Sequence, residues 1–450
     1  MAVLIRRDRG SVPRVLAAAA VIVLASCSSE NGGDDTSGEA DQGDSGTEQA
    51  SSADDSGTAE SGDAAESSEG EAVKLGALVP LTGDLQAYGQ TSRNGIELAV
   101  QQINAAGGVN GQALGLEIGD TQTKPQSGID AAKKLVSIEG VSGIVGALSS
   151  GVTIPVARSV TSKDGVPQIS GASTSPVITD LEDNDFMFRT VPSDAFQGRA
   201  LAEVVAEDGL STVSTIYVNN DYGEGLADSF KAAFEDNGGS VYASAAYEKG
   251  NASYRGELSK LADGDAEALV MIGYPENGTT ILRQALEGGH FDRFVFTDGL
   301  KAPEIIEAVG AESLEGSYGT APEALSDTDA AKNFKSAYED EYGELPPKPF
   351  IDTAYDATYA LALAAEAADS ADGAAVRDKL RDVTNPPGET ILPGEWDKAR
   401  ELIAAGEEID YSGASGSIDF DANGDVSGTF AHWVIRDGKI ETEKVFEPGQ

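Results

Sequence analysis

The sequence predicts an α/β protein in which parallel sheets, covered by helices on both faces, form two lobes. Short apolar runs alternate along the chain with segments whose apolar residues recur at helical spacing. This alternation is typical of parallel sheets with crossover helices. Residues 72–450 are also long enough for two lobes with full cores rather than one.

The first 26 residues are predicted to be a secretory signal. Four arginines among the first 14 residues precede an apolar run at 15–24, which the small residues Ala25 and Ser26 follow. The run has about ten residues where a membrane-spanning helix needs about 20, so a permanent anchor helix is not expected. The only cysteine, Cys27, comes next. It has no second cysteine for an intrachain disulfide or a thiolate metal site.

The stretch LASC at 24–27 resembles the lipobox of bacterial lipoproteins. This resemblance implies cleavage before Cys27 and acylation of its thiol, which would anchor the chain outside the cytoplasmic membrane. The alternative is an ordinary signal peptide with an incidental cysteine.

Residues 27–71 are predicted to be a disordered linker. From Ser28 to Glu71 the chain has 14 acidic residues, no basic ones and no aromatics. It therefore cannot bury enough apolar surface to fold. As a flexible coil it would span about 35 to 40 Å root-mean-square, and charge repulsion would extend it further. An acidic interaction tail is the alternative.

The charge of the chain excludes one class of partner. Of the formal net charge of −45, residues 1–26 carry +3 and residues 28–71 carry −14, so residues 72–450 carry −34. Nucleic acid is not expected as a partner because phosphate binding requires a basic surface. An acidic surface with few lysines suggests adaptation to high salt, where screening reduces self-repulsion.

The first strand and helix of the folded part lie at residues 73–108. The apolar run VKLGALVPL predicts a strand, and Ile96, Ala99, Val100 and Ile103 follow at helical spacing before a glycine pair ends the helix. The same order recurs. Further strands are predicted at LGLEIGD, SGIVGAL, VPQIS, TVSTIYV, EALVMIGY and RFVFTDG, and further helices near residues 131–136, 152–160, 226–234, 281–286 and 303–309.

The usual catalytic motifs are missing from the sequence. His290 and His432 are the only histidines, they lie far apart, and neither has a cysteine or carboxylate cluster beside it. The histidines needed for a catalytic triad or a histidine metal site are therefore lacking beside suitable partners. There is no Walker loop, nucleophile elbow or complete dinucleotide fingerprint, because GEG at 223–225 lacks the third glycine. No enzyme activity, cofactor or metal is expected.

One stretch, DFDANGD at 419–425, imitates a calcium loop. Asp419, Asp421, Asn423 and Gly424 match, but the twelfth position is Phe430, where a bidentate glutamate is required. A hairpin turn at the Asn-Gly pair, between SIDF and GTFAHWVI, is the preferred interpretation.

Several loops that follow predicted strands are suited to a small zwitterion. Ser149 and Ser150 begin a helix, where hydroxyls and free N–H groups would hold a carboxylate. Thr174 lies in the glycine-containing loop after VPQIS, and Asp298 follows RFVFT, where it suits an ammonium group. The alternatives are a plain helix cap for Ser150 and a surface turn for Asp298.

Three tyrosines, Tyr88, Tyr222 and Tyr274, also lie just beyond strand ends. Their rings suit an apolar side chain, while their hydroxyls orient its polar end. Packing between the lobes is the alternative.

Seven motifs resemble one family, and the match runs in order from about residue 73 to the final hairpin and strand. They are VPLTGDLQAYGQ, INAAGGVNG, GALSSGVTIPVA, QISGASTSP, FRTVPSDAFQG, NDYGEGLADSF and AYDATYALALA. They are similar to the leucine/isoleucine/valine-binding proteins, the type 1 periplasmic solute-binding proteins of ABC importers. The family's small-loop disulfide is absent, with Ser149 at one cysteine position.

The resemblance implies two Rossmann-like lobes joined by a three-strand hinge and closed on one ligand. The expected lobes are residues 72–192 with 323–413, and 193–322 with 414–450. Carried over by position, the ligand carboxylate is expected at Ser150 and Thr174, and the ammonium group at Asp298, Thr174 and the Ala172 carbonyl. The tyrosines and Asp298 are expected across the cleft from the carboxylate site.

The function implied is that of a monomeric binding lipoprotein on the outer face of the cytoplasmic membrane. It would bind a branched-chain or related apolar amino acid and deliver it to an ABC permease, with only its lipid in the membrane. Two alternatives stay open: the same fold with an amide, urea or aromatic acid as ligand, and a ligand-sensing receptor module.

Overall fold

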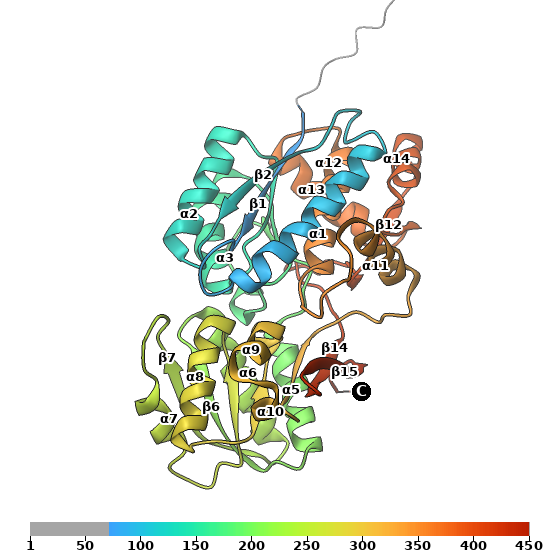
Figure 1. Ribbon diagram of the computed structural model, residues 1–450. Coiled ribbons are helices and arrows are strands. Elements are labelled where there is room, and N and C mark those ends of the chain that lie inside the picture. The colour runs from blue at the N-terminus through green and yellow to red at the C-terminus, as the bar shows by residue number, and fades with distance from the viewer. Residues whose placement is uncertain (1–71, 450) are drawn as a thin grey trace, which may run out of the picture. The chain divides into compact units, whose positions relative to one another are not determined.

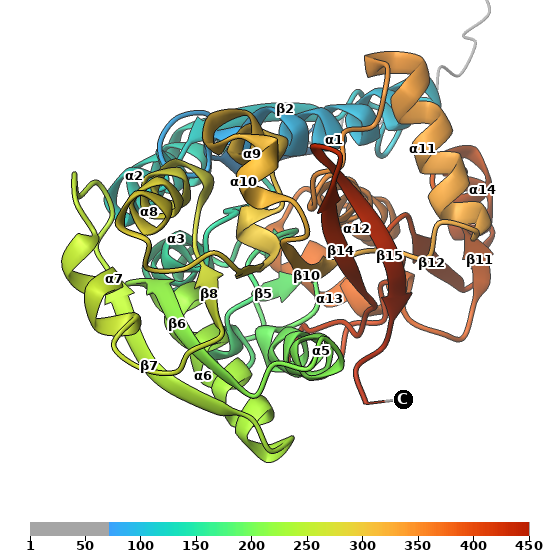
Figure 2. The ribbon, with the colours of Figure 1, turned by 60° about the horizontal axis from the view of Figure 1, so that its bottom comes forward.

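The structure, a computed structural model, describes residues 72–449, so the predicted signal, Cys27 and nearly all of the acidic linker lie outside it. The α/β class with two lobes is confirmed. Figures 1 and 2 show that each lobe is a sheet with helices on both faces.

The first lobe is built on a five-stranded parallel sheet in the order β2-β1-β3-β4-β5. The central strands are buried on both sides of the sheet, which explains why they read as continuous apolar runs. The strands are β1 (Lys74–Val79), β2 (Gly115–Asp120), β3 (Gly143–Gly146), β4 (Gln168–Ser170) and β5 (Met187–Arg189).

Helices α1 and α12 pack together on one face of this sheet, and α2 and α3 pack on the other. Helix α12 is rich in alanine and leucine, which favour helix, and nearly all of it is buried. The α-helices of this lobe are α1 (Gln86–Ala105), α2 (Pro125–Lys134), α3 (Ser150–Val156), α4 (Ser162–Asp164), α11 (Asp329–Tyr342), α12 (Asp352–Ala368), α13 (Gly373–Thr384) and α14 (Trp396–Ala405). Shorter π and 3-10 segments are η1 (Leu135–Glu139), η2 (Ala157–Thr161) and η3 (Pro176–Ile178). A small sheet beside them contains β11 (Glu389–Ile391), β12 (Ile409–Gly413) and β13 (Gly416–Ser417).

The second lobe has a seven-stranded sheet in the order β15-β14-β10-β9-β8-β6-β7. Five strands are parallel, and β14 and β15 add an antiparallel hairpin at one edge. The strands are β6 (Thr212–Val218), β7 (Ser240–Tyr247), β8 (Ala268–Ile272), β9 (Phe294–Phe296), β10 (Tyr318–Pro322), β14 (Phe430–Arg436) and β15 (Lys439–Phe446). The helices are α5 (Asp194–Glu207), α6 (Asp221–Asp236), α7 (Arg255–Leu261), α8 (Pro275–Gly288), η4 (Asp298–Leu300), α9 (Pro303–Val309) and α10 (Ala311–Leu314).

The chain crosses between the lobes three times, after β5, after β10 and before β14. The last two crossings are hydrogen-bonded, since the N–H of Glu323 donates to the carbonyl of Thr429 at 3.1 Å. The first crossing is tied to α12 through the hydroxyl of Thr190, which donates to the carbonyl of Thr353 at 2.7 Å. The last two crossings are therefore bonded to each other, and the first is bonded to the first lobe.

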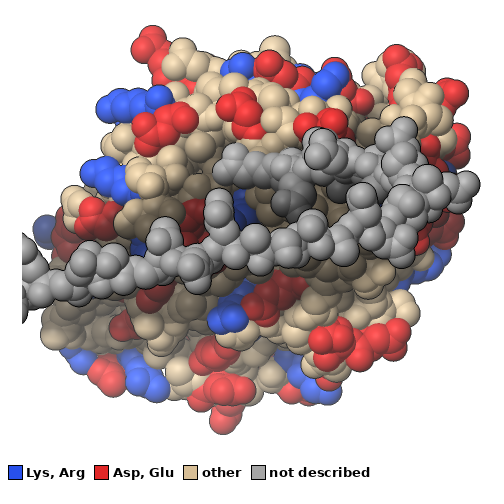
Figure 3. All heavy atoms as spheres, turned by 90° about the horizontal axis from the view of Figure 1, so that it is seen from above, with Lys and Arg blue, Asp and Glu red and all other residues tan. Residues whose placement is uncertain are grey.

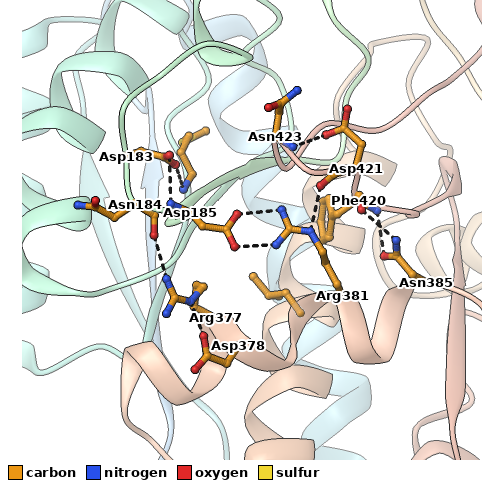
Figure 4. Close-up of polar contacts among 12 residues, drawn as sticks. Asp183, Asn184, Asp185, Arg377, Asp378, Arg381, Asn385, Phe420, Asp421 and Asn423 are labelled. Carbon is orange, nitrogen blue, oxygen red and sulfur yellow. Dashed lines mark hydrogen bonds and ion pairs between the residues drawn. The ribbon is translucent and has the colours of Figure 1, made fainter.

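The predicted hairpin around the Asn-Gly pair of residues 423–424 is wrong. The strand before it, β13, pairs with β12 of the first lobe, whereas β14 pairs with β10 and β15. The segment between is a loop closed by Asp421, whose Oδ1 accepts the N–H groups of Asn423 and Asp425. Figure 4 shows this loop held by Arg381 of α13, which donates to the Asp421 carbonyl and forms a bidentate pair with Asp185.

Two further features of residues 72–449 bear on function. This part of the chain has no helix that is both long and apolar enough to span a bilayer. Over the same residues, no group of three or more His, Cys, Asp and Glu side chains is arranged to hold a metal ion.

Candidate functional site

A cavity lies between the two lobes, where the carboxyl ends of strands from both sheets meet. Parallel α/β sheets place their ligand sites at this edge, because the loops that leave the strands converge there. The cavity is lined by Leu85, Tyr88, Leu148, Ser149, Ser150, Ala172, Tyr222, Tyr274, Asp298, Gly299 and Phe350. Six of the seven predicted site residues are in this group.

Thr174 is the predicted site residue that does not line the cavity. Its buried hydroxyl donates to Asp194 Oδ2 at 2.8 Å. Its carbonyl accepts from the N–H of Asp194 at 2.7 Å and from Arg189 Nη1 at 3.0 Å. Thr174 therefore lies just behind the wall that Ala172 forms.

Ser149 and Ser150 hold the first-lobe side of the cavity, at the start of α3. Ser149 Oγ and Tyr274 Oη are 3.0 Å apart and so form a hydrogen bond across the cleft. Ser150 Oγ accepts the N–H of Ser175 at 3.2 Å, which ties the loop after β3 to the loop after β4. The first N–H groups of a helix have no intrahelical acceptor, so this corner is suited to an anion.

Asp298 holds the second-lobe side, directly after β9. Its Oδ1 accepts the hydroxyl of Tyr222 at 2.7 Å and the amide of Gln197 at 2.9 Å. Gly299 allows this arrangement, because a side chain there would lie 2.3 Å from the Gly273 carbonyl and 3.0 Å from Tyr222 Oη. The carboxylate is therefore fixed by neutral donors, and no cation within residues 72–449 is bonded to it.

Aromatic rings enclose the rest of the cavity. Tyr222 and Tyr274 stack with ring centroids 5.7 Å apart, and Tyr88 meets Phe350 edge to face at 6.2 Å. Tyr88 lies on α1 of the first lobe and not across the cleft with the other two tyrosines. Its hydroxyl nevertheless reaches the second lobe and donates to the Asp298 carbonyl at 3.3 Å.

Burial sets the protonation of these groups. Loss of hydration raises the pKa of Asp298 to about 6, although the hydrogen bonds from Tyr222 and Gln197 oppose the rise. Asp298 is therefore mostly ionised at pH 7. Burial also raises the pKa values of Tyr88, Tyr222 and Tyr274, so their hydroxyls stay protonated and can donate.

The lobes are closed on each other in this structure. The cavity measures about 20 Å³, which is room for little more than a water molecule. Hydrogen bonds between its own groups, such as Ser149 to Tyr274 and Asn220 to Tyr274, take up the polar atoms. A ligand the size of an amino acid therefore requires the side chains or the lobes to separate.

Some lining residues were not predicted. Ser149 was recognised only as part of its loop, although its strand-end position is the same as that of Ser150. Phe350, which lines the cavity, precedes α12, and Gln197, which bonds to Asp298 without lining the cavity, lies inside α5, so neither follows a strand. Only the tertiary fold brings these two positions to Asp298 and Tyr88.

Comparison with known proteins agrees with this geometry. The family model described as periplasmic binding protein matches residues 72–425. The leucine-, isoleucine-, valine-, threonine- and alanine-binding protein of Pseudomonas aeruginosa is 32% identical over 317 residues, which cover 70% of this chain and 83% of that protein. The chemotactic signal transduction system substrate-binding protein BasB of Halobacterium salinarum is 28% identical over 388 residues, covering 84% and 91%.

A solved structure is similar over the same part of the chain. The branched-chain amino acid transporter substrate-binding protein LivJ of Streptococcus pneumoniae, in complex with isoleucine, superposes with a TM-score of 0.71 at 26% identity. The match covers 84% of this chain and all of that one.

Proposed function

Because the chain belongs to the periplasmic binding proteins of the leucine/isoleucine/valine-binding type, we propose that it binds a branched-chain or related apolar amino acid. In this proposal the lobes close on the ligand, and the closed form delivers it to an ABC permease. The similarity to LivJ in complex with isoleucine supports an amino acid as the ligand.

The observation that carries the proposal is the placement of Asp298 opposite Ser150 in one cavity. An α-amino acid offers a carboxylate and an ammonium group on adjacent atoms. The hydroxyl and N–H groups at the start of α3 suit the carboxylate, and the ionised Asp298 suits the ammonium. No other charged side chain lines the cavity among the residues described, so the site favours a ligand without net charge.

The positions of the remaining site residues indicate how they would contact the ligand. The Ala172 carbonyl and Thr174 would assist the ammonium and carboxylate from behind. Tyr88, Tyr222 and Tyr274 would enclose the aliphatic side chain between both lobes. A ligand that touches both lobes favours the closed form by its differential affinity for that form.

Location and partners are also part of the proposal. A lipid on Cys27 would anchor the chain to the outer face of the cytoplasmic membrane, with residues 27–71 as a tether to a permease. The chain would act as a monomer, because one copy supplies both sides of the site.

A ligand-sensing role is the second candidate. The similarity to BasB, whose name places it in a chemotactic signal transduction system, favours it. The same cavity would serve both roles, so ligand binding cannot separate them. Loss of amino-acid uptake on deletion of the gene would favour transport, and loss of a tactic response with normal uptake would favour sensing.

The test of the proposal is a calorimetric titration of the purified protein with leucine, isoleucine and valine. Dissociation constants at or below about 1 μM, or about 8 kcal/mol, are expected for at least one of them. Heat with none of the three would contradict the amino-acid proposal, and chemical turnover of a ligand would contradict the binding role.

A matched pair of variants tests the role of Asp298. Asp298→Asn removes the charge at the cavity, whereas Asp292→Asn removes an exposed charge from the loop before β9, at the other end of the same strand. We expect the first to weaken binding at least a hundredfold and the second to leave it unchanged. Equal affinities would remove Asp298 from the site.

A further inference from the structure

A second buried carboxylate, Asp194, lies behind the cavity and has no role in the proposed function. It is the first residue of α5 and is fully buried. Its Oδ2 accepts the hydroxyl of Thr174 at 2.8 Å, while its Oδ1 has no hydrogen-bond partner within residues 72–449.

Gln197, one turn later in α5, also has a side-chain oxygen without a hydrogen-bond partner in the described part of the chain. Its Nε2 donates to Asp298 Oδ1 at 2.9 Å and to the Thr320 carbonyl at 3.2 Å. Its Oε1 is buried and finds no donor among the residues described. Positions i and i+3 of a helix share a face, so Asp194 and Gln197, each with one unpartnered oxygen, lie on the same side of α5.

Two acceptors cannot bond to each other, but one proton turns this pair into a donor and an acceptor. A protonated carboxyl group has an O–H to donate, and the amide oxygen of Gln197 can accept it. Leaving both oxygens unpaired inside the protein would cost free energy at each of them. The geometry therefore favours a neutral Asp194.

The charges that act on Asp194 also favour its neutral form. The carboxylate whose charge acts on Asp194 is Asp298, and the cation is Arg189, which is already bonded to other groups. Its Nε and Nη2 donate to Asp425, and its Nη1 donates to the carbonyls of Thr174 and Ser175. Burial, followed by the charge of Asp298, raises the pKa of Asp194 well above its ordinary value, while the Thr174 hydroxyl and Arg189 oppose this.

We propose that Asp194 is a positioning residue that works as a neutral acid, donating to Gln197 and accepting from Thr174. It links the loop after β4, on the carboxylate side of the ligand, to the glutamine that holds Asp298 on the ammonium side. Because the two sides belong to different lobes, the link aligns them when the cleft closes. The expected effect of Asp194 on ligand affinity rests on the proposed function, whereas its protonation state does not.

The test compares Asp194→Ala with Asp194→Asn, using leucine, isoleucine and valine as probes. The asparagine amide supplies a donor for Gln197 and an acceptor for Thr174, as the neutral acid does. We expect Asp194→Ala to weaken binding at least tenfold and Asp194→Asn to recover most of that loss. An asparagine variant as weak as the alanine variant would overturn the proposal, because an ionised carboxylate would then be required. Unchanged affinity in Asp194→Ala would overturn it as well.

Asp329 provides the matched control. It is the first residue of α11, as Asp194 is of α5, and each helix has a capping hydroxyl one residue earlier. Its side chain is 86% exposed. Asp329→Ala should therefore report the loss of a helix-terminal charge alone and leave affinity unchanged.

A second readout needs no ligand. The pH slope of the free energy of unfolding counts the protons taken up on folding. A neutral Asp194 adds one proton at pH values above about 4, where the carboxyl group of the unfolded chain is ionised, so Asp194→Asn should lower that count by one. An unchanged slope would overturn the proposal. If wild-type protein binds none of the three amino acids, the proposed function fails, and this slope still decides the state of Asp194.

Discussion

Asp84 of the first lobe and Asn277 of the second are joined by a hydrogen bond in which Asn277 Nδ2 donates to Asp84 Oδ1 at 2.9 Å. The other carboxylate oxygen lies 3.4 Å from Lys249 Nζ, and Lys249 also donates to the Thr123 carbonyl across the cleft. These residues do not line the cavity. They form a latch, defined here as Asp84, Lys249 and Asn277, that favours closure without touching ligand.

Removing the latch should weaken ligand binding. Asp84→Ala removes one hydrogen bond and one partly exposed ion pair, worth about 0.5 to 1 kcal/mol together. We expect a two- to fivefold rise in the dissociation constant by calorimetry. Asp130→Ala is the control, since its exposed carboxylate accepts a hydrogen bond from Gln126 of its own helix and from no other residue in the described part of the chain. A dissociation constant equal to that of the wild type would show that the latch does not contribute to closure.

The pKa of Asp298 predicts opposite pH dependences for binding and for stability. The ligand ammonium requires the ionised carboxylate, so affinity should fall up to about tenfold per unit as pH drops below about 6. The ligand-free protein binds a proton there that the unfolded chain does not bind until about pH 4. Asp298 therefore contributes stability to the ligand-free protein. This contribution is fully present below about pH 4 and is lost as pH rises through about 6.

Titrations between pH 4.5 and 8 would check both trends, and Asp298→Asn supplies the comparison. In that variant the contribution of this group to the pH slope of unfolding should disappear. A wild-type affinity that stays constant down to pH 4.5 would contradict the assignment of Asp298 to the ammonium group.

Asp356 should matter for stability rather than for binding. This buried carboxylate of α12 accepts the hydroxyl of Tyr411 at 2.7 Å, the N–H groups of Ala414 and Ser415 at 2.8 Å, and the Ser415 hydroxyl at 2.6 Å. Asp356→Ala would leave these donors without an acceptor. Each unpaired donor costs about 1 kcal/mol or more, so we expect the free energy of unfolding to fall by about 3 kcal/mol or more.

Urea unfolding at pH 7 measures this loss. Asp378→Ala, which removes a carboxylate that is 65% exposed, should change the free energy of unfolding by less than about 0.5 kcal/mol. A similar small change in Asp356→Ala would mean that water replaces the lost carboxylate.

The sequence predicted the site as far as chain topology alone determines it. Parallel strands bring their carboxyl ends to one edge of each sheet, which marked the loops of Ser150 and Asp298 as candidates. These loops belong to different sheets, and the family resemblance implied that they face one cleft. The roles of Asp194 and Gln197 had no such signal. They depend on how the start of α5 packs against two strand-end loops, and sequence spacing does not encode that packing.

The mistaken hairpin has a similar cause. An Asn-Gly pair between apolar runs is a strong local turn signal. Here the turn is made instead by Asp421, and long-range partners fix it: Arg381 at the Asp421 carbonyl, and Arg189 on Asp425. Tertiary contacts with both arginines determine the loop, and neither is near it in the sequence.

High salt should stabilise this protein. Residues 72–450 carry a formal charge of −34, and Figure 3 shows acidic side chains spread over the face it presents. Mutual repulsion of these charges destabilises the folded state, and it is screened over about 3 Å at 1 M salt compared with about 10 Å at 0.1 M. We therefore expect the melting temperature to rise by several degrees between 0.1 and 2 M KCl.

The variant that tests the cause of this effect keeps the fold and changes only charge. Asp236 and Asp263 are exposed and form no ion pair with any other described residue. Replacing such carboxylates by asparagine should raise the melting temperature at 0.1 M KCl and reduce the gain at 2 M. Salting-out of apolar surface also stabilises proteins at molar salt, but it would leave the gain of these variants equal to that of the wild type. A melting temperature that does not rise with KCl at all would contradict the adaptation to high salt.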